Sequence, residues 1–316
     1  MTHTSRLLSA FAALMLLAGA ASAQTFSIGT SRAGSSVNNL GLALAEAAQG
    51  AGMDLRVTPF NSTTQALPLV AAGDLTFGLA NAYELQMADS GTVAFEGRAI
   101  EGLRLVSPLY PFRLSLMVRG DSDIKSFGDL TGRRVPAGFG ATATGELLIG
   151  GMLSAGGVSF DDVQKVTVSS FGDMRDAFEA GRTDAMITVL GSSRDAQVAE
   201  RVGGIRVLSL PGDAEAEALM QAFVPVARAE PALVAEDITG LDEDIFALTY
   251  DYYLYTDEDT PDEVVKALLE AIVAAREEIA EVVPPFIWFA PDQTVTTIGL
   301  SYHDGALAVT APRPAE

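Results

Sequence analysis

The pattern of apolar and polar residues predicts strands and helices that alternate along the first part of the chain. Polar and apolar side chains alternate at 25–28, as in a half-buried strand. A polar, glycine-containing loop at 29–36 follows, and apolar residues spaced by three and four positions then predict a helix at 37–48. Short apolar runs at 55–57 and 75–79 predict two more strands, with a second helix between them.

The same order of elements recurs in the second half of the chain. It reads strand 134–136, glycine loop 137–144, helix 147–153, strand 166–168, a helix from Phe171, and strand 185–189. Chance produces a single match of this kind easily, but it produces the same order of six elements less readily. Strands that alternate with helices form parallel sheets, because parallel neighbours need a long connection. We therefore expect two α/β lobes built on one plan.

Two further runs predict strands that connect the lobes. Apolar residues at 114–118 predict the first crossing, and the tyrosine-rich run 245–255 predicts the return. Thr260 and Glu263 fit a capping box at the start of an amphipathic helix, which we expect to pack back on the first lobe. Two crossings make a hinge, and loops at the carboxyl ends of the strands would surround a ligand cleft between the lobes.

The N-terminus predicts export. Arg6 precedes an apolar run at 7–20, and Ala21-Ser22-Ala23 fits the small-x-small cleavage pattern, so we expect cleavage after Ala23 and a periplasmic protein. The run is too short for a permanent membrane anchor. The predicted organisation is a signal peptide at 1–23, a first lobe at 24–112 and 249–316, and a second lobe at 113–248.

Composition narrows the function classes. Acidic residues number 41 against 20 basic ones, and the formal net charge of -21 disfavours nucleic acid and anionic membranes as partners. The chain has no cysteine, which excludes disulfides and thiolate metal sites. It has two histidines, of which His3 lies in the predicted signal peptide, so a multi-histidine metal centre is excluded. We expect no cofactor.

The sequence also lacks the motifs of common enzymes. A serine triad would have to use His303, and no Gly-x-Ser-x-Gly elbow is present. The chain contains no phosphate loop that ends in Gly-Lys-Ser/Thr, and the loop at 29–36 lacks the three spaced glycines of a dinucleotide site. We therefore expect a binding protein and not an enzyme.

Candidate ligand-binding residues lie in the two glycine loops and at the ends of the strands. Helix N-termini present unpaired N–H groups and a partial positive charge, which suits a carboxylate. The candidates are Thr30, Ser31, Arg32, Ser35, Ser36, Asn81, Tyr83, Gly140, Thr142, Thr144, Gly191 and Ser192. For Ser35, Ser36, Asn81, Thr142 and Thr144 the alternative is a purely local role as helix caps. For Tyr83 the alternative is packing.

An arginine would complete an anion site, because its fork binds a carboxylate through two hydrogen bonds. Arg113, beside the first predicted crossing, and Arg32, in the first loop, are the leading candidates. For each the alternative is a surface residue that balances acidic neighbours. Trp288, the one tryptophan, is interpreted as a core residue.

The chain resembles the TAXI class of solute-binding proteins of tripartite (TRAP) transporters, across most of the predicted mature sequence. The matching segments are 29–44, 72–83, 105–119, 124–135, 138–146, 180–185 and 302–306. The Ile124-Lys125-Ser126 segment with Asp129-Leu130 and Gly132 is shared by many type II periplasmic binding proteins. One departure is Ser35-Ser36-Val37-Asn38, where the family usually has a pair of aromatic residues.

The resemblance implies a two-lobed periplasmic binding protein fold of type II. It implies an extracytoplasmic receptor that captures a small organic acid or amino acid, such as glutamate or a dicarboxylate, and delivers it to an integral membrane TRAP permease. We expect a monomer. The alternatives are a receptor for an ABC-type permease and a sensory protein that docks on a membrane partner.

Overall fold

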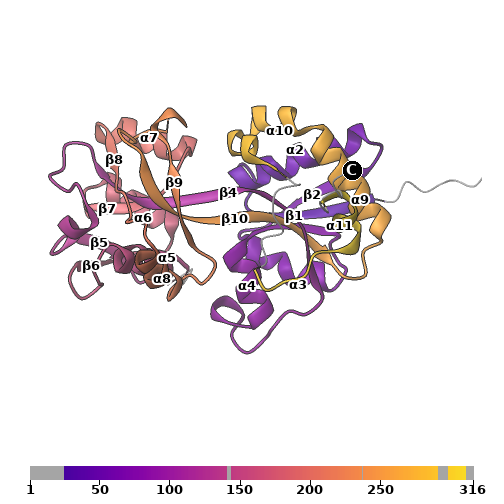
Figure 1. Ribbon diagram of the computed structural model, residues 1–316, viewed down its shortest axis with the longest axis horizontal. Helices are drawn as coiled ribbons and strands as arrows, with labels where there is room; N and C mark the ends of the chain where they lie inside the picture. The colour runs from indigo at the N-terminus through magenta and orange to yellow at the C-terminus, as the bar shows by residue number, and fades with distance from the viewer. Residues whose placement is uncertain (1–24, 141–143, 237, 291–297, 311–316) are drawn as a thin grey trace, which may run out of the picture.

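The computed structural model describes residues 25–140, 144–236, 238–290 and 298–310 (Figure 1). The predicted signal peptide and its cleavage site lie outside these residues, and so does Thr142. Within the described part of the chain, no helix is long and apolar enough to cross a bilayer.

The chain forms the two-lobed α/β architecture that the sequence predicts, with a mixed sheet running through both lobes (Figure 1). The strand order of the sheet is β2-β1-β3-β10-β4-β7, with β8 paired to β4 and β9 to β10. Its strands are β1 (Thr25–Thr30), β2 (Asp54–Pro59), β3 (Phe77–Asn81), β4 (Leu103–Arg119), β7 (Ala185–Val189), β8 (Ile205–Val207), β9 (Arg228–Ala232) and β10 (Ile245–Asp257). A second sheet pairs β5 (Arg134–Ala137) with β6 (Gln164–Thr167) in parallel.

Strands β4 and β10 connect the lobes at the two predicted crossings. They pair antiparallel with each other from Leu103↔Asp257 to Phe112↔Tyr250. Beyond that point they separate, and β4 pairs with β7 from Leu114 onward while β10 pairs with β9. Each of the two long strands therefore belongs to both lobes. The lobes are connected by these two adjacent strands (Figure 1).

The predicted repeat holds in the order of its elements but not in its strand pairing. In the first lobe β1 pairs in parallel with β2 and β3, as expected. In the second lobe β7 pairs antiparallel with β4 and does not join β5 and β6 in one parallel sheet. The carboxylate of Asp184, just before β7, accepts a hydrogen bond from the backbone N–H of Arg134 in β5 (2.8 Å). This N–H is therefore not available for a backbone hydrogen bond to a neighbouring strand.

Helices cover the sheets of both lobes. In the first lobe they are α2 (Ser36–Gly50), α3 (Leu67–Ala71), α4 (Ala82–Ser90), α9 (Asp262–Ala274), α10 (Arg276–Val282) and α11 (Asp304–Thr310), and in the second α5 (Thr144–Ala155), α6 (Phe171–Glu179), α7 (Ser193–Val202) and α8 (Ala214–Gln221). Short 3-10 turns are η1 (Thr63–Gln65), η2 (Val93–Phe95), η3 (Phe127–Leu130), η4 (Val234–Glu236) and η5 (Pro284–Trp288).

Helix α9 packs on the first lobe through the apolar face that the sequence predicts. Val265, Leu268 and Ile272 are fully buried in a core that they share with residues of α2 and β1. The predicted capping box does not form at its start, because Pro261 is the N-cap residue and no side chain caps the helix. The Thr260 hydroxyl turns instead to the hydroxyl of Thr256 (2.8 Å).

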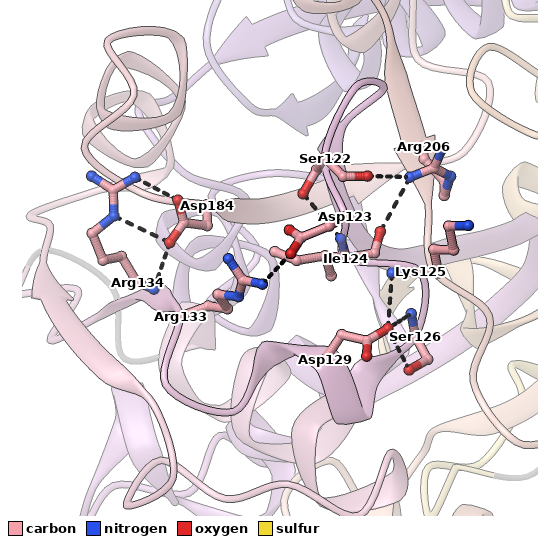
Figure 2. Close-up of polar contacts among 10 residues, drawn as sticks. All are labelled: Ser122, Asp123, Ile124, Lys125, Ser126, Asp129, Arg133, Arg134, Asp184 and Arg206. Carbon is pink, nitrogen blue, oxygen red and sulfur yellow. Dashed lines mark hydrogen bonds and ion pairs between the residues drawn. The ribbon is translucent and has the colours of Figure 1, made fainter.

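The segment from Ser122 to Arg134 connects β4 to β5 and stabilises that end of the second lobe (Figure 2). Asp129 and Ser126 form a capping box around η3. Arg206 of β8 donates hydrogen bonds to the carbonyl oxygens of Ser122 (3.1 Å) and Ile124 (3.2 Å), as Figure 2 shows. Since this end of β4 lies farthest from its pairing with β10, we assign the segment to the scaffold.

Candidate functional site

The first glycine loop is shaped by hydrogen bonds among its own candidate residues. Thr30 ends β1 fully buried, and its hydroxyl accepts a hydrogen bond from the Asn38 side-chain amide (3.1 Å). The Ser35 hydroxyl accepts from the Asn38 backbone N–H (3.1 Å) and lies 2.7 Å from the Ser31 hydroxyl. The capping alternative for Ser35 is therefore what the structure shows. Asn38 holds the loop at both ends, a role that sequence reasoning missed.

Among the candidate residues of this loop, Arg32 and Ser36 are exposed. Ser36 is the first residue of α2, where backbone N–H groups of the first turn have no partners inside the helix. The Arg32 guanidinium is exposed and has no hydrogen bond or ion pair within the described residues, so it is accessible to a ligand or to solvent. These two residues keep the ligand-binding interpretation, while Thr30, Ser31 and Ser35 support the loop.

Asn81 caps α4 and does so as one half of a capping box. Its side-chain oxygen accepts from the Glu84 backbone N–H (2.9 Å), and the Glu84 carboxylate accepts from the Asn81 backbone N–H (3.2 Å). The same carboxylate accepts from the Thr63 hydroxyl (2.8 Å). Burial raises the pKa of Glu84, against the lowering effect of these hydrogen bonds. The cap is therefore an internal, tightly bonded structure at the end of β3.

Tyr83 makes a contact between the lobes. Its side chain is only 4% exposed, and its hydroxyl donates to the carbonyl oxygen of Phe223, which follows α8 in the second lobe (3.0 Å). Burial raises the pKa of the Tyr83 hydroxyl, so it stays a donor. The packing alternative thus describes Tyr83 in this conformation, with an added hydrogen bond between lobes.

The second glycine loop leads from β5 to α5. Gly138 has a φ of +90°, which favours glycine, and its N–H donates to the Glu146 carboxylate (2.8 Å). The ring of Phe139 is buried where a Cβ on Gly145 would collide with it (2.3 Å). Gly140 is exposed, and Thr144 is half-buried at the first position of α5. The loop therefore anchors Phe139 inside while Gly140 stays at the surface.

Gly191 and Ser192 lie at the end of β7 beside a cavity of about 100 Å³. Gly191 has a φ of +78°, and Ser192 is the N-cap residue of α7 without a capping side-chain bond. The buried Asp195 carboxylate accepts instead from the Val189 N–H (2.8 Å) and the Thr188 hydroxyl (2.9 Å). Burial raises its pKa despite these bonds. The Ser192 hydroxyl, unused as a cap, is one of the groups that line the cavity.

Arg113 lies on β4 next to this cavity region and contacts residues of both lobes. Its carbonyl oxygen accepts from the Leu190 N–H (3.0 Å), directly before Gly191. Its guanidinium lies over the ring of Trp288 (4.3 Å to the ring centre), and its Nη1 donates to Oε2 of Glu236 (2.5 Å). Its Nε is buried and has no hydrogen-bond partner among the described residues. We call Arg113, Glu236 and Trp288 the arginine cluster.

The arginine cluster contains two residues whose roles the sequence did not reveal. Trp288 is 37% exposed and covers Arg113, so its interpretation as a core residue is wrong. The reason is that η5 packs its phenylalanine side, Phe286, into the core and leaves the indole at the rim. Glu236 sits in an irregular segment with many acids, and no sequence pattern distinguishes it from them.

Aromatic rings connect the two sides of the candidate site. Phe112, next to Arg113, packs against Tyr250 and Tyr252 of β10, with ring centres 5.7 and 5.9 Å apart. Tyr252 pairs directly with Asn81 across the sheet. The structure therefore places the backbone of Arg113 beside Leu190, directly before Gly191 and Ser192, and the crossing strands link this region to Asn81. Among the described residues, no group of three or more metal-ligating side chains is present.

Comparison with solved structures shows the same fold. MatC from Rhodopseudomonas palustris with bound malate is 18% identical over 87% of this chain and 92% of that chain, with a TM-score of 0.54. A TctC solute-binding protein from Polaromonas is 17% identical over 82% and 87%, with a TM-score of 0.54. A putative periplasmic sulfonate-binding protein SsuA from Methylobacillus flagellatus is 15% identical over 82% and 71%, with a TM-score of 0.51.

Sequence comparison extends this likeness from the fold to the family. The sequence profile of the NMT1-like family matches residues 28–309, which includes both lobes, the two crossing strands and every candidate residue of the site. The chain therefore belongs to the NMT1-like family.

Proposed function

We propose that this chain is an extracytoplasmic receptor that captures a small organic anion, an organic acid or an amino acid such as glutamate or a dicarboxylate. It delivers the solute to the integral membrane permease of a TRAP transporter of the TAXI class. The fold supports a binding protein, since it is shared with MatC bound to malate. The predicted signal peptide supports a periplasmic location.

One observation supports an anionic ligand. A buried guanidinium lies at the crossing between the lobes and is not fully hydrogen-bonded. Arg113 is only 11% exposed, and its Nε has no partner within the described residues. A buried N–H without a partner is costly, and functional sites are where such costs are found. A ligand carboxylate that binds two N–H groups of the guanidinium would add hydrogen-bond partners that the protein does not supply.

The surrounding groups supply the remaining contacts of the proposed site. The α2, α5 and α7 N-termini follow β1, β5 and β7, and each presents backbone N–H groups. We assign direct contact to Arg32, Ser36, Gly140, Thr144, Gly191 and Ser192 together with Arg113, and to Thr142 as a further proposal. Thr30, Ser31, Ser35, Asn81 and Tyr83 would position these groups. The lobe boundaries at 112/113 and 248/249 are part of the same proposal.

Substitution of Arg113 tests the proposal. A hydrogen bond to a charged group contributes about 1.5–3 kcal/mol, so Arg113→Ala should weaken binding of an organic acid about tenfold to a hundredfold. Thermal-shift screening with organic acids and amino acids identifies the ligand, because binding to the native state raises the unfolding midpoint. Arg32→Ala is the matched comparison in the exposed loop. If both variants bind an organic acid as tightly as the parent, no arginine clamps the ligand.

A second candidate partner is an ABC-type permease, which the structural likeness to SsuA favours. Uptake by vesicles that contain the permease distinguishes the two, since a TRAP permease needs an ion gradient and an ABC permease needs ATP. A sensory role would instead show solute binding without uptake by either type of permease. We propose a monomer in each case, which size-exclusion chromatography with light scattering checks.

A further inference from the structure

We propose that Glu236 is an internal competitor of the ligand. In this conformation the Glu236 carboxylate is paired with the Arg113 guanidinium. A ligand carboxylate takes its place on binding. The inference rests on the proposed function, because it assumes that Arg113 binds an anion. It adds a residue that decides which ligands the site accepts.

The geometry of the pair shows why it is replaceable. Oε2 of Glu236 accepts from Nη1 of Arg113 at 2.5 Å, and the two side chains are 19% and 11% exposed. Nε of the same guanidinium is left buried without a partner among the described residues. A carboxylate in the best geometry binds two N–H groups of the fork at once. A ligand carboxylate that binds Nη1 and Nη2 together takes two N–H groups where Glu236 takes one, and it displaces Glu236 because both need Nη1. Nε lies on the other edge of the guanidinium and takes no part in this exchange.

The two partners differ in how firmly they are held. Arg113 lies on β4, its backbone bonds to Leu190, and Trp288 covers its guanidinium. Glu236 lies in the three-residue turn η4, and its Oε1 accepts a long hydrogen bond from the Leu233 N–H (3.4 Å). We therefore infer that the arginine stays in place during the exchange and the glutamate moves.

This arrangement gives the site a preference for anions. A buried guanidinium without a counterion destabilises a fold strongly, so Glu236 keeps the empty site stable. A neutral solute offers no replacement charge and leaves the Arg113–Glu236 pair intact. A ligand carboxylate replaces the Arg113–Glu236 pair by an ion pair with two hydrogen bonds to the guanidinium. Selection thus arises from the competitor as much as from the contacts of the ligand.

Glu236→Gln tests the competitor directly. The amide keeps the shape and one acceptor but removes the charge, so malate, 2-oxoglutarate or glutamate should bind about tenfold more tightly than to the parent. Trp288 is the one tryptophan of the chain and touches Arg113, so its fluorescence reports binding at this site. Glu236→Asp keeps the charge but shortens the reach, and it should also bind more tightly.

Glu230→Gln is the matched control. Glu230 is paired with Arg228 in β9 (2.7 Å), so its loss removes the same charge without touching Arg113. Its affinity should match that of the parent. If Glu236→Gln binds these anions equally or more weakly while Arg113→Ala loses them, the competitor is wrong and the proposed function stands. If no variant and no parent protein binds any of the three anions by fluorescence or thermal shift, the proposed function itself fails for this class of ligand.

Discussion

At the scale of single residues, Glu84 is a half-buried carboxyl group in the first turn of α4, close to tyrosines of β10. Burial raises its pKa above the ordinary 4.5, more than the hydrogen bonds from Thr63 and the Asn81 N–H lower it. Its negative charge also contributes to raising the pKa values of Tyr250, Tyr252 and Tyr255. The folded state thus favours the protonated form of Glu84.

Glu84→Gln should therefore stabilise the protein at neutral pH, because the amide carries no charge to desolvate. A raised pKa in the folded state contributes stability below the unfolded pKa, and this contribution is lost as the pH rises through the folded pKa. The advantage of the variant should shrink toward pH 4 and grow toward pH 8, as measured by urea unfolding across this range. A variant that is less stable at every pH would show that α4 needs the ionised carboxylate as its cap.

Residue roles were predictable where a local rule decides them and not where packing does. Ser35 and Asn81 were expected either to cap a helix or to bind ligand, and both cap. Arg113 was selected because it sits beside a crossing strand, and the structure does place it there. Its partners Glu236 and Trp288 come from segments more than a hundred residues away in sequence, so no local pattern indicates them.

At the scale of elements, the ion pair between Arg134 and Asp184 connects β5 to the start of β7 (Figure 2). Asp184 accepts from the Arg134 backbone N–H and from its Nε (3.1 Å), and the Asp184 N–H donates to the Arg134 carbonyl oxygen (2.8 Å). Burial alone would raise the pKa of Asp184, but the hydrogen bonds and charge of Arg134 outweigh it and lower the pKa.

Asp184→Asn should destabilise the protein by about 1–3 kcal/mol at pH 7, because it leaves a partly buried guanidinium with weaker partners. A lowered pKa contributes stability above the unfolded pKa, and this is lost as the pH falls through the folded pKa. The difference from the parent should therefore shrink at pH 3 in urea unfolding. Asp161→Asn, which removes an exposed ion pair with Lys165, should change stability by less than about 0.5 kcal/mol. Equal losses in the two variants would contradict this account.

The order of elements followed from apolar spacing, whereas their pairing did not. β4 was expected as a short strand at 114–118, but it runs over 17 residues and includes Pro108 and Pro111. Its two ends pair with different strands in different lobes, so no single periodic pattern spans it. The antiparallel place of β7 likewise depends on the long β4 beside it, a contact that the local repeat does not encode.

At the scale of the whole molecule, the lobes are held together by continuous strands, by an apolar core with residues from both lobes, and by polar side-chain contacts. The continuous strands β4 and β10 form the covalent connection (Figure 1). The hydrogen bond from Tyr83 to the Phe223 carbonyl oxygen and the contact of Trp288 with the Arg113 guanidinium also cross between the lobes. The two strands keep the lobes connected and can bend. Side-chain contacts between the lobes can break and re-form. We therefore expect the side-chain contacts to influence the relative position of the lobes, and a ligand bound between them, as proposed, to change it.

Tyr83→Phe should loosen the lobes, because it removes the hydrogen bond to Phe223 and keeps the ring. Solution scattering of the ligand-free variant should give a larger radius of gyration than the parent, and stability should fall by about 1 kcal/mol. A saturating anion that binds the parent should reduce the radius of both, since the ligand adds its own contacts between the lobes. Tyr110→Phe is the control, because Tyr110 lies buried where β4 pairs with β10, and its hydroxyl loss should leave the radius unchanged. If Tyr83→Phe and the parent have the same radius with and without the anion, the strands alone fix the lobes and the pocket is preformed.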